Sequence, residues 1–359
     1  MAFVSGVQII DVPAGALNNS GMAKGSDNEN TVAVKYLEAG IRPYKRRLPY
    51  VSAQAYRNWL RNTLAATGNG DWTVAPIFRE KKVAYTDANP ITYADDDVFG
   101  YMRAPGKKVE ASDSRAEMVG DTPTKETVTR VSPFRVGTLV GLADSIANDF
   151  GIMSRHNGDP VPYEHQFYRT SLKGMFSLDL GSIGKFTYVR RTGYLNLDEE
   201  RVKRAQEEGL EHIESEQAYR LPYDLRVKRA ASVLRAMPVI TGGAKQTLHY
   251  TDVSPVVIIA AITQGGNNPF QYAIDADMNG QAKVDIEALE EIGSVWGDTI
   301  LSPVYIGWVR GYARDNQKAL EEVMSKLSEV FPFGIVLDHP RKIMEVLANS
   351  LKDHPEWWG

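Results

Sequence analysis

The stretch DLRVKRAASVLRAMPVITGGAKQTLHYTDVSPVVIIAAIT, residues 224–263, decides how the rest of the chain is arranged. Its first part alternates apolar and basic residues at helical spacing, and Pro238 ends the helix because its ring cannot continue the backbone hydrogen-bond ladder. The run after Pro255 is apolar and rich in β-branched residues, as in a central strand covered on both faces. The sequence therefore predicts a helix over 224–237, a glycine-marked loop, and a buried strand over 254–262.

The predicted helix is amphipathic and basic. Leu225, Val227 and Leu234 belong to its apolar side. The basic residues of the segment are assigned to the opposite face, namely Arg226, Lys228, Arg229 and Arg235.

The loop between helix and strand contains two glycines and a lysine. Gly242 and Gly243 allow backbone N–H groups to approach a phosphate, and Lys245 adds positive charge. A simple helix-to-strand turn with a solvated lysine is an open alternative. A nucleotide P-loop is excluded, because the glycine spacing differs and the order here is helix then strand.

Composition indicates a soluble globular protein. The chain has 359 residues, of which 43% are hydrophobic and 24% charged, enough for one large domain or two ordinary ones. It has no cysteine, which excludes disulfides and thiolate metal sites and favours a cytoplasmic location. The start lacks the pattern of a signal peptide, and no apolar run approaches the ~20 residues of a membrane helix, so no membrane partner is expected.

Charge is segregated along the chain, although the net value is only −4. Acidic residues gather over 207–216, 285–291 and 321–329. Basic residues gather over 42–61, at 190–191 and over 226–235. A protein with one basic and one acidic face can hold a polyanion while it stacks against copies of itself.

The segment 51–61 is predicted to be a helix with Ser52 as its N-cap. Gln54, Arg57 and Arg61 recur at three and four residues and therefore share one face. Two arginines on one stripe suit a phosphodiester backbone better than a single small anion, the alternative being an exposed helix face without function. A second basic cluster precedes the helix, formed by Lys45, Arg46 and Arg47.

Catalytic patterns are weak. None of the six histidines pairs with another at i, i+4, and no Gly-x-Ser-x-Gly elbow occurs. His156 and His165 could act as acid and base in RNA cleavage, but hydrogen-bonded surface histidines are commoner. The acidic run 95–97 is better interpreted as a solvated loop or helix cap than as a metal site. The residues therefore favour a binding or assembly protein without a metal or other cofactor.

The remaining segments divide the chain further. The first strand is expected over 4–12, and 66–130 is expected to project from the core as an insertion. Residues 150–160 are expected to form a loop. The segments 161–169 and 174–180 are expected to pair as a projecting hairpin.

Six short stretches, taken together and in order, resemble one family. They are PAGALNN (13–19), VSAQxxR (51–57), SPFRV (132–136), FGxM (150–153), FSLDL (176–180) and GGAKQT (242–247). The chain resembles the repeated backbone subunit of type I CRISPR Cascade complexes, the Cas-seven proteins. It is most similar to the DevR/Cst-type branch of type I-B systems, and the resemblance covers nearly the whole chain.

The resemblance implies an α+β fold, with a ferredoxin-like (RRM-type) palm, an inserted finger region and a projecting thumb β-hairpin. The palm would begin with residues 1–66 and the finger would be 67–130. The palm core would be 131–262, with the thumb over about 163–181. Residues 263–359 would elaborate the palm.

It also implies that several copies line up on one CRISPR RNA and present its spacer to a target DNA strand. Further partners would be Cas-five, Cas-six and Cas-eight type subunits and a small subunit. The residues implied to bind RNA are Asn18, Asn19, Lys45, Arg46, Arg47, Ser52, Gln54, Arg57, Arg61, Met153, Gly242, Gly243, Lys245 and Gln246. The thumb residues near the kinked base would be Phe167, Tyr168 and Lys173. Lys107 and Lys108 would face the target DNA.

No catalytic residue is implied by the resemblance. The main alternative is an RNA-cleaving CRISPR protein, a guide-processing or type III-like endonuclease that would use His156 or Asp179. A third alternative is a structural protein that assembles without nucleic acid.

Overall fold

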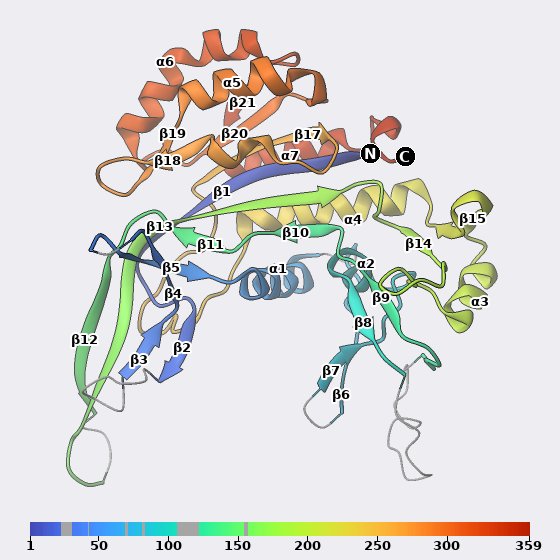
Figure 1. Ribbon diagram of the computed structural model, residues 1–359, viewed down its shortest axis with the longest axis horizontal. Coiled ribbons are helices and arrows are strands. Elements are labelled where there is room, and N and C mark those ends of the chain that lie inside the picture. The colour runs from blue at the N-terminus through green and yellow to red at the C-terminus, as the bar shows by residue number, and fades with distance from the viewer. Residues whose placement is uncertain (23–30, 42, 69–70, 81–82, 106–121, 154–156) are drawn as a thin grey trace.

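The computed structural model describes all residues except 23–30, 42, 69–70, 81–82, 106–121 and 154–156 (Figure 1). The described part is a mixed α/β fold built around a 12-stranded sheet. The main path of that sheet runs β21-β20-β17-β1-β13-β11-β5-β4. It is a mixed sheet, because β20 and β21 pair in parallel whereas β1 pairs antiparallel with both of its neighbours.

The centre of the sheet is formed by three long strands: β1 (Ala2–Gly15), β13 (Val161–Asp179) and β17 (Val257–Gln264). Every residue of β17 up to Thr263 is buried, so the predicted central strand covered on both faces is confirmed, although it begins three residues later than expected. In β1, Val4 and Ile10 face one core, while Val7 and Ile9 face the other. This alternation lets one strand bury apolar side chains on both sides of the sheet.

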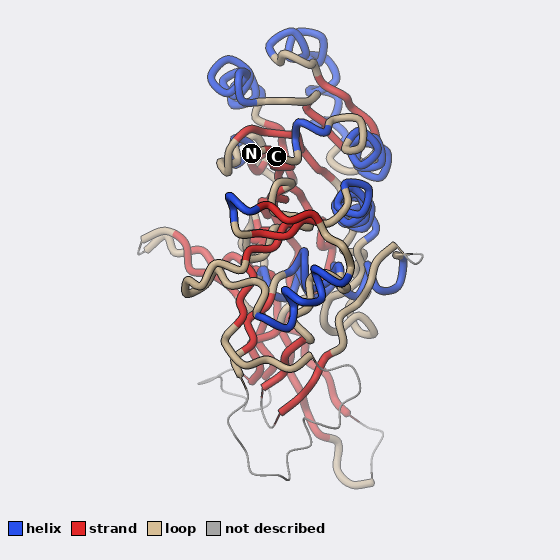
Figure 2. Tube along the Cα trace, turned by 90° about the vertical axis from the view of Figure 1, so that its right-hand side faces the viewer, coloured by secondary structure: helices blue, strands red, loops and turns tan. Residues whose placement is uncertain are grey.

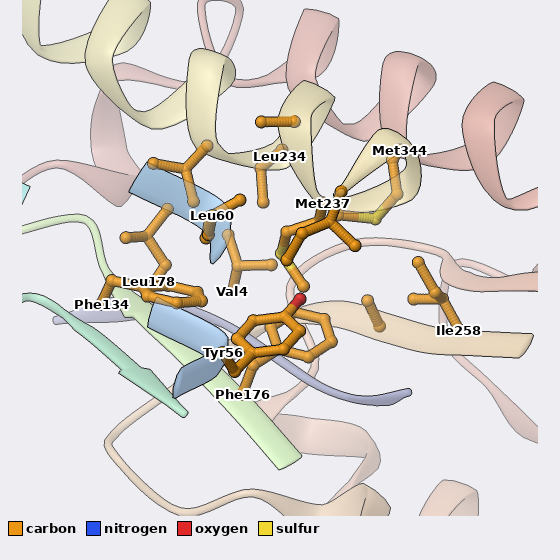
Figure 3. Close-up of a cluster of buried hydrophobic side chains, with 14 of the residues drawn as sticks. Val4, Tyr56, Leu60, Phe134, Phe176, Leu178, Leu234, Met237, Ile258 and Met344 are labelled. Carbon is orange, nitrogen blue, oxygen red and sulfur yellow. The ribbon is translucent and has the colours of Figure 1, made fainter. Parts of the chain in front are cut away.

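Two layers of helices cover the two faces. The helices α1 (Ala53–Thr67), α4 (Tyr223–Ala236) and α7 (Pro340–Ser350) contribute to one core, and α5 (Ile286–Trp296) and α6 (Arg314–Val330) to the other. Figure 3 shows the first core, where Leu60, Leu234 and Met344 pack over Val4 and Ile258.

The outer strands complete the sheet. On the path they are β4 (Tyr36–Ala39), β5 (Arg46–Val51), β11 (Leu139–Gly141), β20 (Val304–Trp308) and β21 (Ile335–Asp338). Off the path lie β2 (Asn19–Met22), β3 (Thr31–Val34), β10 (Phe134–Val136) and β12 (Ile146–Met153).

Smaller elements decorate this frame. They are β6 (Ile77–Glu80), β7 (Val83–Thr86), α2 (Ala94–Phe99), β8 (Tyr101–Arg103), β9 (Val128–Arg130), β14 (Lys185–Thr187), α3 (Glu199–Glu207), β15 (Glu211–Ile213), β16 (Ala218–Arg220), β18 (Ile274–Ala276) and β19 (Ala282–Val284). The upper part of the molecule is rich in helix, and its lower part consists mainly of strands and loops (Figure 2). No helix in the described ranges is long and apolar enough to cross a membrane.

The basic outer face predicted for 224–237 is wrong in part. Arg226 and Arg229 are only 3% and 2% exposed. Arg226 donates to the carbonyl oxygens of Ile183 and Trp358, at 2.7 and 2.8 Å, and Arg229 donates to backbone and carboxylate oxygens. A long guanidinium stem can bury its carbons while its N–H groups find acceptors, so helical spacing alone misplaced these side chains.

The solvated loop or cap predicted for the acidic run 95–97 is also wrong. These residues lie in α2, and all three are buried. Asp97 accepts hydrogen bonds from Arg130 and Arg229, whose side chains are themselves 3% and 2% exposed. The paired cations make burial of the carboxylate possible.

The hairpin predicted from 161–169 and 174–180 is wrong as well, because one continuous strand, β13, runs through both segments. Its hairpin partner is β12, which includes the first four residues, 150–153, of the predicted loop 150–160. Ile146 through Met153 pair antiparallel with Tyr168 through Val161, and the two strands project together from the body (Figure 1). Gly174 lies within β13. Its position lacks a side chain because a Cβ there would lie 2.8 Å from Leu139.

Candidate nucleic-acid interface

The glycine loop is fixed between α1 and the turn after β1. A Cβ added to Gly242 would lie 2.3 Å from the Trp59 ring, and Gly242 has a φ of +156°. The Thr241 N–H donates to Thr63 Oγ1 at 3.0 Å, and the Ala244 N–H donates to the Leu17 carbonyl at 3.0 Å. The glycine therefore serves first to bring the loop against the tryptophan.

Gln246 closes this loop from within. Its Nε2 donates to the Gly242 carbonyl at 2.5 Å, and its Oε1 accepts from the Thr251 N–H at 2.9 Å. Lys245 adopts a φ of +50° and is half-buried, and burial lowers the pKa of its ammonium group. The Lys245 carbonyl accepts from the Leu248 and His249 N–H groups, but across the described ranges the ammonium group has no hydrogen bond or ion pair, so this side chain can meet an anion.

The turn after β1 brings two predicted residues to the same loop. Asn18 Nδ2 donates to the Tyr50 carbonyl at 3.4 Å, and the Asn18 carbonyl accepts from the Lys35 N–H at 3.0 Å. Asn19 is half-buried. Since Leu17 binds the glycine loop, Asn18 and Asn19 lie next to it in space although more than 200 residues separate them in the chain.

The start of α1 agrees with the N-cap predicted from the sequence. Ser52 is its N-cap and accepts a hydrogen bond from the Ala55 N–H at 3.3 Å. Gln54 is exposed.

Arg57 and Arg61, the two arginines that share one face of α1, both have partners within the fold. Arg57 donates to the Phe99 carbonyl, and Arg61 Nε lies 3.1 Å from Asp95 Oδ1. Both guanidinium groups lie over the Phe99 ring, at 5.6 and 4.8 Å from its centroid. Burial, followed by repulsion from Arg61, lowers the pKa of Arg57. The Arg61 side chain is still 35% exposed, so Arg61 both contacts α2 and reaches solvent.

The second basic cluster lies on the β4–β5 hairpin. Lys45, Arg46 and Arg47 are exposed. Lys45 makes an ion pair with Glu38, and Arg47 lies over the Tyr36 ring at 5.3 Å. Such exposed pairs contribute little to stability, so these cations can exchange partners at low cost.

The three predicted thumb residues lie in different surroundings. Phe167 is half-buried and stacks on His249, with ring centroids 5.2 Å apart. Tyr168 is fully buried in the core, so it does not reach a surface where a kinked base could lie. Lys173 is half-buried and donates to the Ile274 carbonyl at 2.6 Å, and its place near a kinked base stays a prediction. Their places follow from the continuity of β13, which carries them into the central sheet.

Several predicted positions lie outside the described residues. They are Lys107, Lys108 and His156. Met153 ends β12, but its side chain is not described. Asp179, the alternative nuclease residue, is 6% exposed and accepts from the N–H and hydroxyl of Ser182 at 3.2 and 2.7 Å.

The sequence reasoning missed one cluster. His165 Nε2 lies 2.8 Å from His249 Nε2 and 3.3 Å from Asp149 Oδ2. Tyr163, His165 and Phe167 alternate along β13, a period-two pattern that could have placed their rings on one face of the strand. In the part of the chain that the structure describes, no three His, Cys, Asp or Glu side chains form a group that could hold a metal ion.

Comparison with known families identifies the chain. The family model described as "CRISPR-associated negative auto-regulator DevR/Csa2" matches residues 57–282. The chain belongs to the DevR/Csa2 family. This match spans Arg57, the β12–β13 hairpin and the glycine loop, and it confirms the family resemblance drawn from the short motifs.

Solved structures similar to this DevR/Csa2 chain are only distantly related in sequence. One, titled "CRISPR RNA-guided surveillance complex", is 12% identical, with a TM-score of 0.46 over 97% of this chain and 99% of the other. A second, titled "CRISPR RNA-guided surveillance complex, pre-nicking", is 11% identical, with a TM-score of 0.49 over 97% and 100% of the two chains. No curated protein matches the DevR/Csa2 chain.

Proposed function

We propose that this chain is a backbone subunit of a type I CRISPR surveillance complex (Cascade). Several copies bind the spacer of one CRISPR RNA in a helical filament and present it for pairing with a target DNA strand. The observation that carries this proposal is the family match over residues 57–282. The subunit acts in the cytoplasm, together with Cas-five, Cas-six and Cas-eight type subunits and a small subunit.

A subunit that accepts any spacer must ignore base identity and contact phosphates and backbone shape. The exposed cations of the β4–β5 hairpin suit this role, and so does Lys245. The partly exposed Arg61 extends the same charge along α1, and the exposed amide of Gln54 adds a polar contact. Asn18 and Asn19 add polar contacts beside the glycine loop.

Within this proposal the large sheet is the palm and 67–130 the finger, with Lys107 and Lys108 toward the target DNA. The thumb is the β12–β13 hairpin, which replaces the hairpin expected over 163–181. Met153, at the far end of β12, is then the residue that wedges between bases.

The subunit is proposed to be non-catalytic. The engagement of both Asp179 oxygens by Ser182 supports this over the nuclease alternative. Purified protein incubated with guide precursor and target RNA, with and without magnesium, should leave both RNAs intact. Defined cleavage products would contradict the non-catalytic proposal and favour the RNA-cleaving alternative.

Assembly on RNA tests the proposal directly. Reversing three charges on the β4–β5 hairpin (Lys45→Glu, Arg46→Glu, Arg47→Glu) should prevent assembly on guide RNA, measured by size-exclusion chromatography. The matched control reverses three exposed lysines on α6 and α7 (Lys318→Glu, Lys326→Glu, Lys342→Glu) and should assemble normally. Complexes of normal length with the hairpin variant would show that these cations do not hold the RNA.

A further inference from the structure

The β12–β13 hairpin is joined to the segment after the glycine loop by a pair of histidines. His165, on β13, is 4% exposed, and its Nε2 lies 2.8 Å from His249 Nε2. The Tyr163 ring stacks on His165 with centroids 5.8 Å apart, and Phe167 stacks on His249. The two imidazoles are thus held in one relative orientation.

The contacts assign the hydrogens of this pair. Only one hydrogen can lie between two nitrogens 2.8 Å apart, so one ring donates and the other accepts. Asp149 Oδ2, a pure acceptor when ionised, lies 3.3 Å from His165 Nε2, so this nitrogen carries the hydrogen. If His249 accepts at Nε2, its ring hydrogen lies on Nδ1, which has no hydrogen-bond partner within the described ranges. That N–H is available to a ligand.

Among the described residues, few charges surround the pair. Lys245 comes from the glycine loop, Asp149 from β12, and the phenol of Tyr163 from β13, while β3, which pairs with β13 beside His165, carries no ionisable side chain. Burial lowers the pKa of His165 most, followed by Lys245 and His249, and Asp149 opposes them. Burial and Lys245 therefore disfavour protonation of His165, and a bound anion would offset the repulsion from Lys245.

We propose that His249 Nδ1 and Lys245 Nζ form a phosphate subsite for one phosphodiester of the bound RNA, and that its occupation is coupled to the uptake of one proton by the His165–His249 pair. The inference rests on the proposed RNA-binding function and adds to it a specific contact. The pair can accept one more proton because the proton can go to the second nitrogen of His165, which leaves a single hydrogen between the facing atoms.

The test measures binding of a fluorescein-labelled single-stranded RNA by anisotropy, at about pH 6 and about pH 8 and at equal ionic strength. Linkage of one proton strengthens binding at the lower pH by at most about tenfold per pH unit, and we expect at least a severalfold effect. His249→Phe retains a ring against Phe167 but has no nitrogen, and it should bind more weakly and lose the pH dependence. Lys245→Gln should bind more weakly at both pH values and retain the dependence.

The matched control is His212→Phe. His212 is another histidine stacked on aromatic rings, those of Tyr188 and Tyr219, and it lies on β15 in a separate sheet. It should behave like the wild type. Proton uptake by the unaltered chain is measured independently, by calorimetry of RNA binding in buffers of different ionisation enthalpy, so the result does not depend on whether a variant folds.

The outcomes separate the two proposals. RNA binding with no proton uptake, equal at both pH values, would overturn the subsite and leave the proposed function standing. Absence of RNA binding at either pH would overturn the proposed function, and the subsite with it.

Discussion

Burial shifts the pKa of single residues in this chain, and Asp96 is the clearest case. It is fully buried, and its Oδ2 accepts from the Asn89 N–H at 2.8 Å. Burial raises the pKa of Asp96 to about 6, against hydrogen bonds that lower it. Between the ordinary value of 3.8 and about 6, the folded chain holds a proton that the unfolded chain releases. This contribution to stability is complete below 3.8 and is lost as the pH rises through 6.

Asp96→Asn should therefore raise the free energy of unfolding by about 3 kcal/mol at about pH 8, and by about half as much at about pH 5. The amide removes the ionisation but keeps an oxygen for the Asn89 N–H. Denaturant titrations at the two pH values measure the difference. Exposed Asp298→Asn is the control and should shift both titrations equally. A gain from Asp96→Asn that is the same at both pH values would refute the linkage.

At the scale of elements, buried ion pairs fasten the projecting regions to the core. Asp97 of α2 bonds Arg130 of β9 and Arg229 of α4, with Asp97 Oδ2 2.7 Å from Arg229 Nη1. The Gly184 N–H also donates to both carboxylate oxygens, at 3.2 and 3.0 Å. One carboxylate thus connects a helix of the 67–130 region to the helix layer over the main sheet.

Asp97→Ala should lower the free energy of unfolding by about 3 to 5 kcal/mol, because it leaves two buried guanidinium groups without their shared anion. Asp95→Ala, on the same helix, removes a pair whose arginine is 35% exposed and should cost much less. Chemical denaturation of the three proteins gives the comparison. Equal losses for the two variants would mean that burial of the pair is irrelevant.

At the scale of the whole molecule, charge separates into two regions despite a net charge of −4. The acidic helices α5 and α6 lie together at the top of the molecule in Figure 1, away from the exposed cations of β4–β5. Such separation lets a weakly acidic protein attract a polyanion locally.

Neutralising those cations (Lys45→Gln, Arg46→Gln, Arg47→Gln) should make RNA binding less sensitive to salt. If each contacts a phosphate of single-stranded RNA, the slope of log affinity against log salt should become shallower by about 2. Lys318→Gln with Lys326→Gln and Lys342→Gln changes the net charge equally and should leave the slope unchanged. RNA affinity measured over a series of salt concentrations distinguishes the two variants. Identical slopes for both would mean that the phosphate contacts lie elsewhere.

The sequence by itself determined the family, the glycine loop, the Ser52 cap and the doubly buried strand that became β17, because short motifs, capping residues and apolar runs act through neighbours in the chain. Only the tertiary structure decided that Arg226 and Arg229 are buried, that Arg57 and Arg61 clasp α2, and that His165 meets His249. Each of these three arrangements depends on a hydrogen-bond acceptor or an aromatic ring that a distant segment of the chain supplies. Periodicity shows which side of an element a residue occupies, but not what packs against that side.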